Sequence, residues 1–235
     1  MDNQLQRASW AAFNLPFRPW MRRRVRIRIA GLPKDLPADQ PVMLVANHVS
    51  WWDGFVLREV QQQLRPSATF SVPMLQRELA RHPYFKLLGA VPIDGSSPKT
   101  VARAVRTMES RIKDDPSSVI AYFPQGEIRP SFARPLGFRR GLELFASHLA
   151  PLTILPVALH MEALNAASPT IFAVAGQPMP VDQVGVRHDA VQAELERVLD
   201  ILLIALDLLG ERIERIWPAP FEPAPASAAS RLAAG

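Results

Sequence analysis

Short apolar runs, each the length of one buried strand, alternate along this chain with longer segments whose apolar residues recur at helical spacing. Strands that alternate with helices form a largely parallel sheet covered by helices. The sequence therefore predicts one α/β domain: a central, largely parallel sheet flanked by helices, an N-terminal amphipathic helical segment and a long C-terminal helix. The predicted strands cover residues 24–30, 42–46, 68–72, 90–94, 118–123, 153–160 and 170–175, and the predicted helices after the N-terminal one cover 51–63, 74–88, 98–113, 141–148 and 188–216.

The length of 235 residues allows a full core within a single domain. We expect three parts, namely a membrane-associating segment at 1–23, the main domain at 24–217 and a flexible tail at 218–235, which is rich in Pro and Ala. The long C-terminal helix carries an apolar stripe that is predicted to pack on the sheet. Its members are Val191, Leu195, Val198, Leu199, Leu202, Leu206, Leu209 and Ile213.

A histidine and an aspartate, His48 and Asp53, follow directly after the apolar run 41–46. In α/β proteins sites are usually built at the ends of such strands. Histidine is the side chain best suited to move a proton near neutral pH, and a carboxylate on its other ring nitrogen would fix the tautomer. Positions five apart on one helix point roughly 140° away from each other. The two side chains can therefore meet only if His48 lies in the turn and Asp53 in the first helical turn.

A structural role for the same residues is the alternative. Ser50 and Asp53 have the spacing of a capping box, in which Ser50 caps the helix and Asp53 reaches back to the cap amide. Under that interpretation His48 is an ordinary loop residue. The spacing alone does not decide between the two.

Three further segments lie downstream in a fixed order. They are Leu88-Gly89-Ala90-Val91-Pro92-Ile93-Asp94, then Tyr122-Phe123-Pro124-Gln125-Gly126-Glu127-Ile128-Arg129-Pro130, then Ile154-Leu155-Pro156-Val157-Ala158. Together with Asn47-His48-x4-Asp53 they resemble the four motifs of the glycerolipid acyltransferases, the family of 1-acylglycerol-3-phosphate acyltransferases. The set spans positions 41 to 160, and its order makes the resemblance specific.

This resemblance implies an enzyme that moves a fatty acyl group from a thioester, on coenzyme A or an acyl carrier protein, to a hydroxyl of a lysophospholipid or glycerol phosphate-type lipid. His48 would remove the hydroxyl proton and Asp53 would hold the imidazole. No cofactor beyond the acyl thioester cosubstrate is implied, and the sequence predicts no metal site. The residues that we expect to bind substrate are Asn47, Trp52, Gln125, Gly126, Glu127 and Arg129.

The departures from the family pattern concern the recognition of phosphate. The family's second motif continues with an arginine that is understood to bind the acceptor phosphate, and Gly95 stands here instead. In the third motif Gln125 replaces Glu, Glu127 replaces Thr, and the arginine is displaced to Arg129. Phosphate binding is then rebuilt on other cations, or the acceptor is a phosphate-free glycolipid or carotenoid-type lipid. A non-catalytic lipid-binding scaffold is the third alternative.

Arginines and aromatic residues gather near the start of the chain. Of the 27 Lys and Arg residues only four are Lys, and 22–28 holds five Arg within seven positions. Buried rings beside cations are typical of an interfacial membrane anchor, so we expect a peripheral membrane protein at the cytoplasmic face. A core-packing helix followed by a strand is the alternative, and nucleic acid is not an expected partner. The predicted membrane contacts are Trp10, Phe13, Phe17, Trp20, Arg22, Arg23 and Arg24.

Overall fold

The computed structural model describes residues 3–182 and 185–217, and its architecture is the predicted α/β domain. Its sheet has eight strands in the order β1-β7-β6-β2-β5-β3-β4, with β8 paired to β6. The strands are β1 Arg26–Ala30, β2 Val42–Ala46, β3 Phe70–Leu75, β4 Ala90–Ile93, β5 Val119–Tyr122, β6 Leu152–Glu162, β7 Thr170–Ala175 and β8 Met179–Val181.

Strand β2 lies at the centre of the sheet, and all five of its residues are buried. It pairs in parallel with β5 on one side and with β6 on the other. Among the strands of residues 3–182 and 185–217, only the pairs of β6 with β7 and with β8 are antiparallel. The carboxyl ends of β2, β5 and β6 therefore meet at one edge of the sheet, where α/β proteins place their sites.

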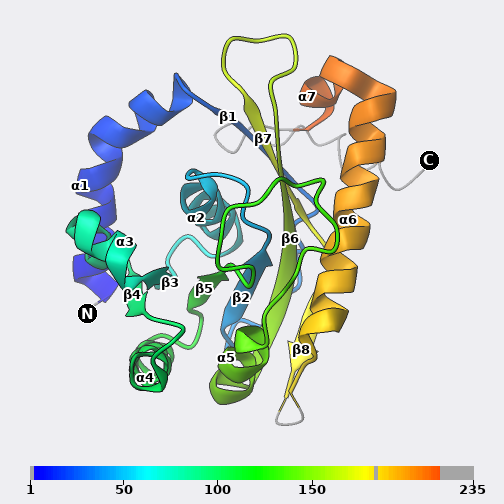
Figure 1. Ribbon diagram of the computed structural model, residues 1–235. Coiled ribbons are helices and arrows are strands. Elements are labelled where there is room, and N and C mark those ends of the chain that lie inside the picture. The colour runs from blue at the N-terminus through cyan, green and yellow to red at the C-terminus, as the bar shows by residue number, and fades with distance from the viewer. Residues whose placement is uncertain (1–2, 183–184, 218–235) are drawn as a thin grey trace.

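Helices cover both faces of the sheet (Figure 1). One apolar layer packs α1 Asn3–Arg22 and α2 Asp53–Leu64 against the strands. The opposite layer contains α4 Pro98–Asp114, α5 Gly141–Leu149 and α6 His188–Leu209. The short helix α3 Gln76–Arg81 and the 3₁₀ turn η1 Pro83–Lys86 lie beside the edge strand β4. Among the residues described, no helix is both long and apolar enough to cross a bilayer.

Helix α1 is tied into the domain core, which corrects one predicted membrane contact. The Trp10 side chain is only 5% exposed, and its Nε1 donates a hydrogen bond to Leu88 O at 3.0 Å. Gln6 is also buried and bonds both backbone groups of Phe70. Trp10 is therefore a packing residue with almost no surface left for a lipid, because its ring fills the space between α1 and the sheet.

Several predicted boundaries move, each for a physical reason. The helix expected at 188–216 breaks at Gly210, whose φ of 52° favours glycine, and the chain continues as the 3₁₀ turn η2 Gly210–Arg212 and α7 Ile213–Ile216. The stretch 74–88 divides into α3 and η1 at Pro83, which cannot donate the hydrogen bond that would continue a helix. Strand β8 was not predicted from the sequence. The tail expected at 218–235 lies outside the residues described.

Two of the five arginines at 22–28 lie on β1 and are paired within the fold. Arg26 Nη1 lies 2.7 Å from a carboxylate oxygen of Glu214, and Arg28 Nε donates to the Glu214 backbone oxygen at 3.2 Å. These two arginines hold α7 against β1, so they are not part of a free cationic surface.

Candidate active site

The turn that follows β2 is fixed by Asn47. Its Nδ2 donates to Leu159 O and its Oδ1 accepts from Leu159 N, both at 2.8 Å, and the side chain is 1% exposed. Asn47 was predicted to bind substrate, and the structure corrects this. Its amide is fully used in joining the end of β2 to β6, so it acts on the site by fixing where His48 begins.

Asp53 opens α2 and points back into the turn. His48 Nδ1 lies 2.7 Å from Asp53 Oδ2, and the same oxygen accepts from Val49 N at 2.6 Å and from Ser50 N at 2.9 Å. Asp53 Oδ1 accepts from Ser50 Oγ at 2.5 Å. Asp53 thus reaches back to the amide of Ser50, as the capping box predicts, and also holds His48. Ser50 itself does not cap the helix, which corrects the other half of that interpretation, because α2 begins at Asp53 with Trp52 as its N-cap and without a side-chain cap. The carboxylate is 0% exposed.

The His48 ring is positioned so that one nitrogen faces outward. Since a carboxylate only accepts, Nδ1 donates to Asp53, and a neutral ring then has Nε2 free to accept a proton. Within the part of the chain that the structure describes, Nε2 makes no hydrogen bond, and the side chain is 25% exposed. The ring stacks on Phe123, with centroids 4.5 Å apart and planes 26° apart. Phe123 stood in the quoted motif, but only the structure shows it against the imidazole.

Gln125 lies under the backbone of His48. Its Oε1 accepts from His48 N at 2.7 Å, its Nε2 donates to Leu136 O at 2.9 Å, and it is 2% exposed. The prediction that Gln125 binds substrate is therefore corrected, because both ends of its amide are occupied by backbone groups. A carboxylate at this position could accept from His48 but could not donate to Leu136, which gives a physical reason for the amide.

The remaining third-motif residues lie in the loop between β5 and α5. Gly126 takes a φ of 71°, and its N–H donates to Phe123 O at 3.1 Å, so this amide is not open to a ligand. Glu127 is exposed. Arg129 N donates to His48 O at 2.8 Å, and its Nη1 donates to Leu136 O at 3.3 Å. The loop thus holds the backbone of Arg129 against the backbone of His48.

One arginine near the site was missed. A Cβ placed on Gly126 would lie 3.2 Å from Nη1 of Arg139, so this guanidinium covers the glycine. Arg139 N also donates to Pro124 O at 3.1 Å. The segment Phe138-Arg139-Arg140-Gly141 gives no spacing signal that would have selected this residue.

A buried hydrogen bond between Ser131 and His160 ties the loop between β5 and α5 to β6, and these two residues were also missed. Ser131 Oγ and His160 Nδ1 are 2.6 Å apart, and His160 Nε2 lies 3.4 Å from Glu162. Burial lowers the pKa of His160 from 6.5, and the hydrogen bond with Glu162 partly offsets this. Ser131 is only 6% exposed, so this arrangement holds the loop and does not present a nucleophile.

The second-motif turn differs from the family pattern in its chemistry. Asp94 Oδ1 accepts from both the N–H and the hydroxyl of Ser96, and these bonds hold the pKa of Asp94 below its usual range. A Cβ on Gly95 would meet nothing within 4 Å. The backbone thus has no need of glycine here, and the position would accept a side chain.

Aromatic rings connect the start of α2 to α1. Trp52 lies 5.4 Å from Trp20 and 5.2 Å from Trp51 between ring centroids, and Phe17 packs on Phe55 at 4.4 Å. Trp52 is partly buried, whereas Trp51 is 46% exposed and Trp20 is 41% exposed. Phe13 and Phe17, both predicted membrane contacts, are partly buried in this cluster.

The cations at the end of α1 are exposed. Arg22, Arg23 and Arg24 all lie at the surface, and the Arg24 guanidinium carbon is 4.6 Å from the centroid of the Trp20 ring. Of the seven predicted membrane contacts, these four residues are the ones that the fold leaves open to solvent.

Comparisons with known proteins identify the family and the fold. The sequence profile of the Acyltransferase family matches residues 26–160, which is more than half of the chain. The crystal structure of the 1-acyl-sn-glycerophosphate (LPA) acyltransferase, PlsC, from Thermotoga maritima is similar with a TM-score of 0.50 and 19% sequence identity, over 86% of this chain and 78% of that one. At this identity the likeness shows a common fold. No curated protein matches the sequence.

Proposed function

This chain belongs to the acyltransferase family, and from that premise we propose that it transfers a fatty acyl group from an acyl thioester to a hydroxyl of a lysophospholipid. The observation that carries the proposal is the pair His48 and Asp53, with Nδ1 held at 2.7 Å and Nε2 facing outward. A histidine in this state is suited to act as a general base.

The chemistry that we propose is a direct transfer. Nε2 of His48 accepts the proton of the acceptor hydroxyl as the oxygen attacks the thioester carbonyl. Asp53 stabilises the imidazolium that forms, since the carboxylate stays bonded to Nδ1. The tetrahedral intermediate then releases the thiolate, which takes the proton from His48, so the base is restored. No covalent intermediate on the chain is required, and the sequence contains no cysteine.

Recognition of the acceptor is assigned to the loop between β5 and α5. Arg129 is the cation of the third motif, and its backbone bond to His48 O keeps it beside the base. Arg139 lies over Gly126 in the same loop. We assign the acceptor phosphate to these guanidinium groups, because arginine binds phosphate in a bidentate manner and Gly95 has no side chain to offer.

We further propose that the protein works as a peripheral protein at the cytoplasmic face of a membrane. Trp20 and the cations at 22–24 are exposed at one end of α1, next to the aromatic cluster that reaches Trp52. An exposed ring beside arginines favours the interface of an anionic bilayer. A lipid acceptor would then approach the site from the membrane, while the thioester donor arrives from solution.

A phosphate-free acceptor is the second candidate, and one observation favours it. Gly95 stands where the family has its phosphate-binding arginine, and the space around it is open. Glu127 of the third motif is an exposed acid. A carboxylate near a phosphate is unfavourable.

The test follows thiol release from palmitoyl-CoA with lysophosphatidic acid, and separately with a phosphate-free glycolipid, while mass spectrometry identifies the acylated lipid. Acylation of lysophosphatidic acid is the expected result. Acylation of the glycolipid alone would replace the first candidate with the second. Thiol release without any acylated lipid would refute both, because water would then be the acceptor.

A further inference from the structure

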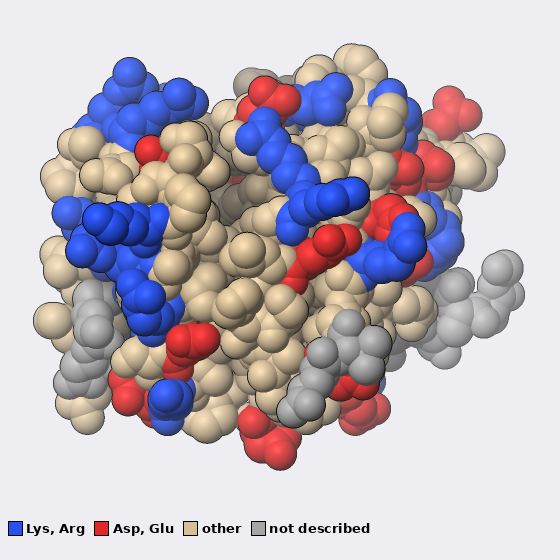
Figure 2. Space-filling model, turned by 60° about the horizontal axis from the view of Figure 1, so that its bottom comes forward, with Lys and Arg blue, Asp and Glu red and all other residues tan. Residues whose placement is uncertain are grey.

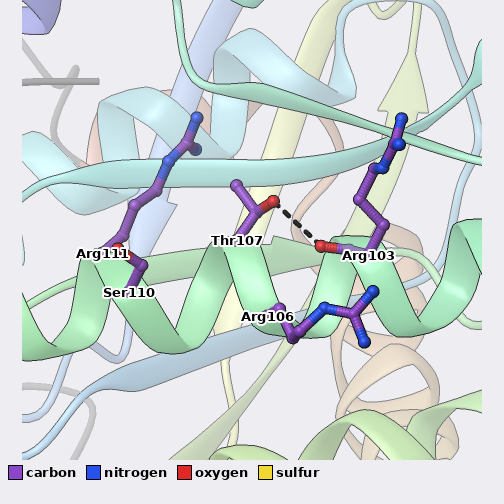
Figure 3. A pocket seen from close by; sticks show the side chains of 5 residues that line it. All are labelled: Arg103, Arg106, Thr107, Ser110 and Arg111. Carbon is purple, nitrogen blue, oxygen red and sulfur yellow. Dashed lines mark hydrogen bonds between the residues drawn. The ribbon is translucent and has the colours of Figure 1, made fainter.

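Two adjoining hollows lie along α4, at the end of the sheet formed by β4. The first is an open, shallow depression lined by α4 alone, and Figure 3 shows its five residues, Arg103, Arg106, Thr107, Ser110 and Arg111. The second, of about 300 Å³, lies between α4, α3, η1 and β4 and is lined by Gln76, Leu79, Ala80, Lys86, Pro92, Thr100 and Arg103. Arg103 belongs to both, so we call the pair the α4 groove.

The α4 groove is cationic and lacks any acid in its lining. Lys86, Arg103 and Arg106 are exposed, and none of the three forms an ion pair within residues 3–182 and 185–217. Figure 2 shows Lys and Arg side chains on the left, the side on which Figure 1 places α1, α3 and α4, and also over the centre and the right. Cations that no carboxylate neutralises are available to a polyanion.

Arg111 gives the groove a fixed boundary. Its Nη1 donates to Ser71 Oγ at 2.7 Å and to Gly89 O at 2.8 Å, and the side chain is 8% exposed. Figure 3 shows Arg103 and Arg111 extending from the same side of α4, with Thr107 between them. Thr107 Oγ1 bonds Arg103 O at 2.9 Å. Guanidinium, ammonium and hydroxyl groups are the donors that bind phosphates in proteins.

The groove lies within reach of His48. Pro92 lines it from the last half of β4, and β4 is separated from β2 by β3 and β5 in a parallel array. Three strand spacings are roughly 14 Å. The pantetheine arm of coenzyme A has its thioester sulfur about 13 bonds from the nearest phosphorus, which is roughly 16 Å when extended. The second hollow also lies at the edge of the sheet that carries His48, since Gln76 directly follows β3 and Thr100 lies in the first turn of α4, so this end of the groove is the one that a thioester held at His48 can reach.

We propose that the α4 groove binds the phosphate-bearing nucleotide end of an acyl-CoA donor. The second hollow is lined from four elements and offers the Lys86 ammonium and the Arg103 guanidinium, which are donors that bind phosphates, and a carrier protein is an outcome that the test distinguishes. The inference rests on the proposed function, because it names the donor of the same reaction. The inference goes beyond the proposed function because it assigns Lys86, Arg103 and Arg106 to binding of the donor and not of the acceptor.

The test compares donors that differ only in their phosphates. Lysophosphatidic acid is acylated from palmitoyl-CoA, from palmitoyl-N-acetylcysteamine, which has no phosphate, and from palmitoylated acyl carrier protein. The variants are Arg103→Ala, Arg106→Ala and the double variant. Lys113→Ala is the matched control, since Lys113 is an exposed cation of α4 that lines neither hollow.

We expect the KM for palmitoyl-CoA to rise about fivefold for each cation removed and about 25-fold in the double variant. The KM for the truncated thioester should change by less than twofold, and Lys113→Ala should match the wild type. An equal rise for both thioesters, or no rise for palmitoyl-CoA, would overturn the inference. A rise confined to the carrier protein donor would overturn it too, since the surface would then serve a protein.

Binding of free coenzyme A, measured by calorimetry on the same proteins, separates this inference from the proposed function. Weaker binding by the double variant supports the groove even if no lipid is acylated. Failure of the wild type to bind coenzyme A would overturn the groove, while turnover of the truncated thioester would leave the proposed function intact.

Discussion

The replacement Asp53→Asn tests the role of the charge in the candidate site, because the structure allows the asparagine to keep the hydrogen bonds. Its oxygen can take the place of Oδ2 and accept from His48 Nδ1, Val49 N and Ser50 N. Its Nδ2 then faces Ser50 Oγ, which can accept. The reverse orientation would set an amide donor against two backbone donors, so the orientation is fixed.

The expected loss is therefore in the rate and not in the fold. Without the negative charge the imidazolium that forms during proton transfer is no longer stabilised. We predict a fall in kcat of about 10²- to 10⁴-fold, the range that general base catalysis contributes. The stability should fall by only about 1–2 kcal/mol, as one charged acceptor becomes neutral.

Asp53→Ala should behave differently. Removal of the Asp53 carboxylate leaves the N–H groups of Val49 and Ser50 without an acceptor. At about 1–2 kcal/mol for each partly buried donor, the loss is about 2–4 kcal/mol, a large share of a typical stability of about 5–15 kcal/mol. Ser50→Ala is the control for the hydroxyl that donates to Asp53 Oδ1, with a loss of about 1 kcal/mol and less than a tenfold change in kcat.

The assay is thiol release from palmitoyl-CoA under saturating lysophosphatidic acid, with urea unfolding of each variant alongside. An Asp53→Asn variant that keeps its kcat within threefold of the wild type would refute the reasoning, because the carboxylate would then serve only the helix.

Three further predictions follow from other parts of the structure. Gln125→Glu places a carboxylate oxygen against Leu136 O, and urea unfolding should show that the free energy of unfolding falls by about 2–3 kcal/mol. Gln125→Met is the uncharged comparison of similar size. Burial lowers the pKa of His160, so as the pH falls this histidine is protonated in the unfolded chain before it is protonated in the folded one. The free energy of unfolding should therefore be highest above pH 6.5 and should fall as the pH drops below it, and His160→Gln should flatten that part of the stability–pH curve. Replacing Arg23 and Arg24 by Ala should weaken sedimentation with anionic vesicles by about 2 kcal/mol, or roughly 30-fold, and unchanged binding would remove them from the membrane contact.

The parts of the fold that depend on local sequence were predicted correctly. Strand β2 follows from an apolar run, and the turn after it brings His48 to Asp53 in the first turn of α2, as the spacing predicts. The predicted cap is the exception, because α2 begins at Asp53 with Trp52, and not Ser50, as its N-cap. The apolar stripe of α6 was also predicted, since its buried residues recur at helical spacing from Val191 to Leu202.

The errors concern contacts between residues far apart in the chain. Asn47 and Gln125 are polar residues in motifs, and their burial depends on Leu159 and Leu136, which the sequence does not place beside them. The position of Trp10 in the sequence is the same whether its face of α1 contacts lipid or the core. The hydrogen bond from Trp10 to Leu88 O shows that this face packs on the core. The pairing of β8 with β6 gives no signal in so short a segment.

The central claim is that Nε2 of His48 takes the proton of the acceptor hydroxyl, and the most direct measurement is the rate of thiol release by His48→Ala in a single turnover with lysophosphatidic acid. Asp53 keeps its bonds to the Val49 and Ser50 amides in this variant, so thermal unfolding should change little. The account predicts a rate at least about 10²-fold below that of the wild type, with palmitoyl-CoA still bound. A rate within tenfold of the wild type would contradict it, because another group would then remove the proton.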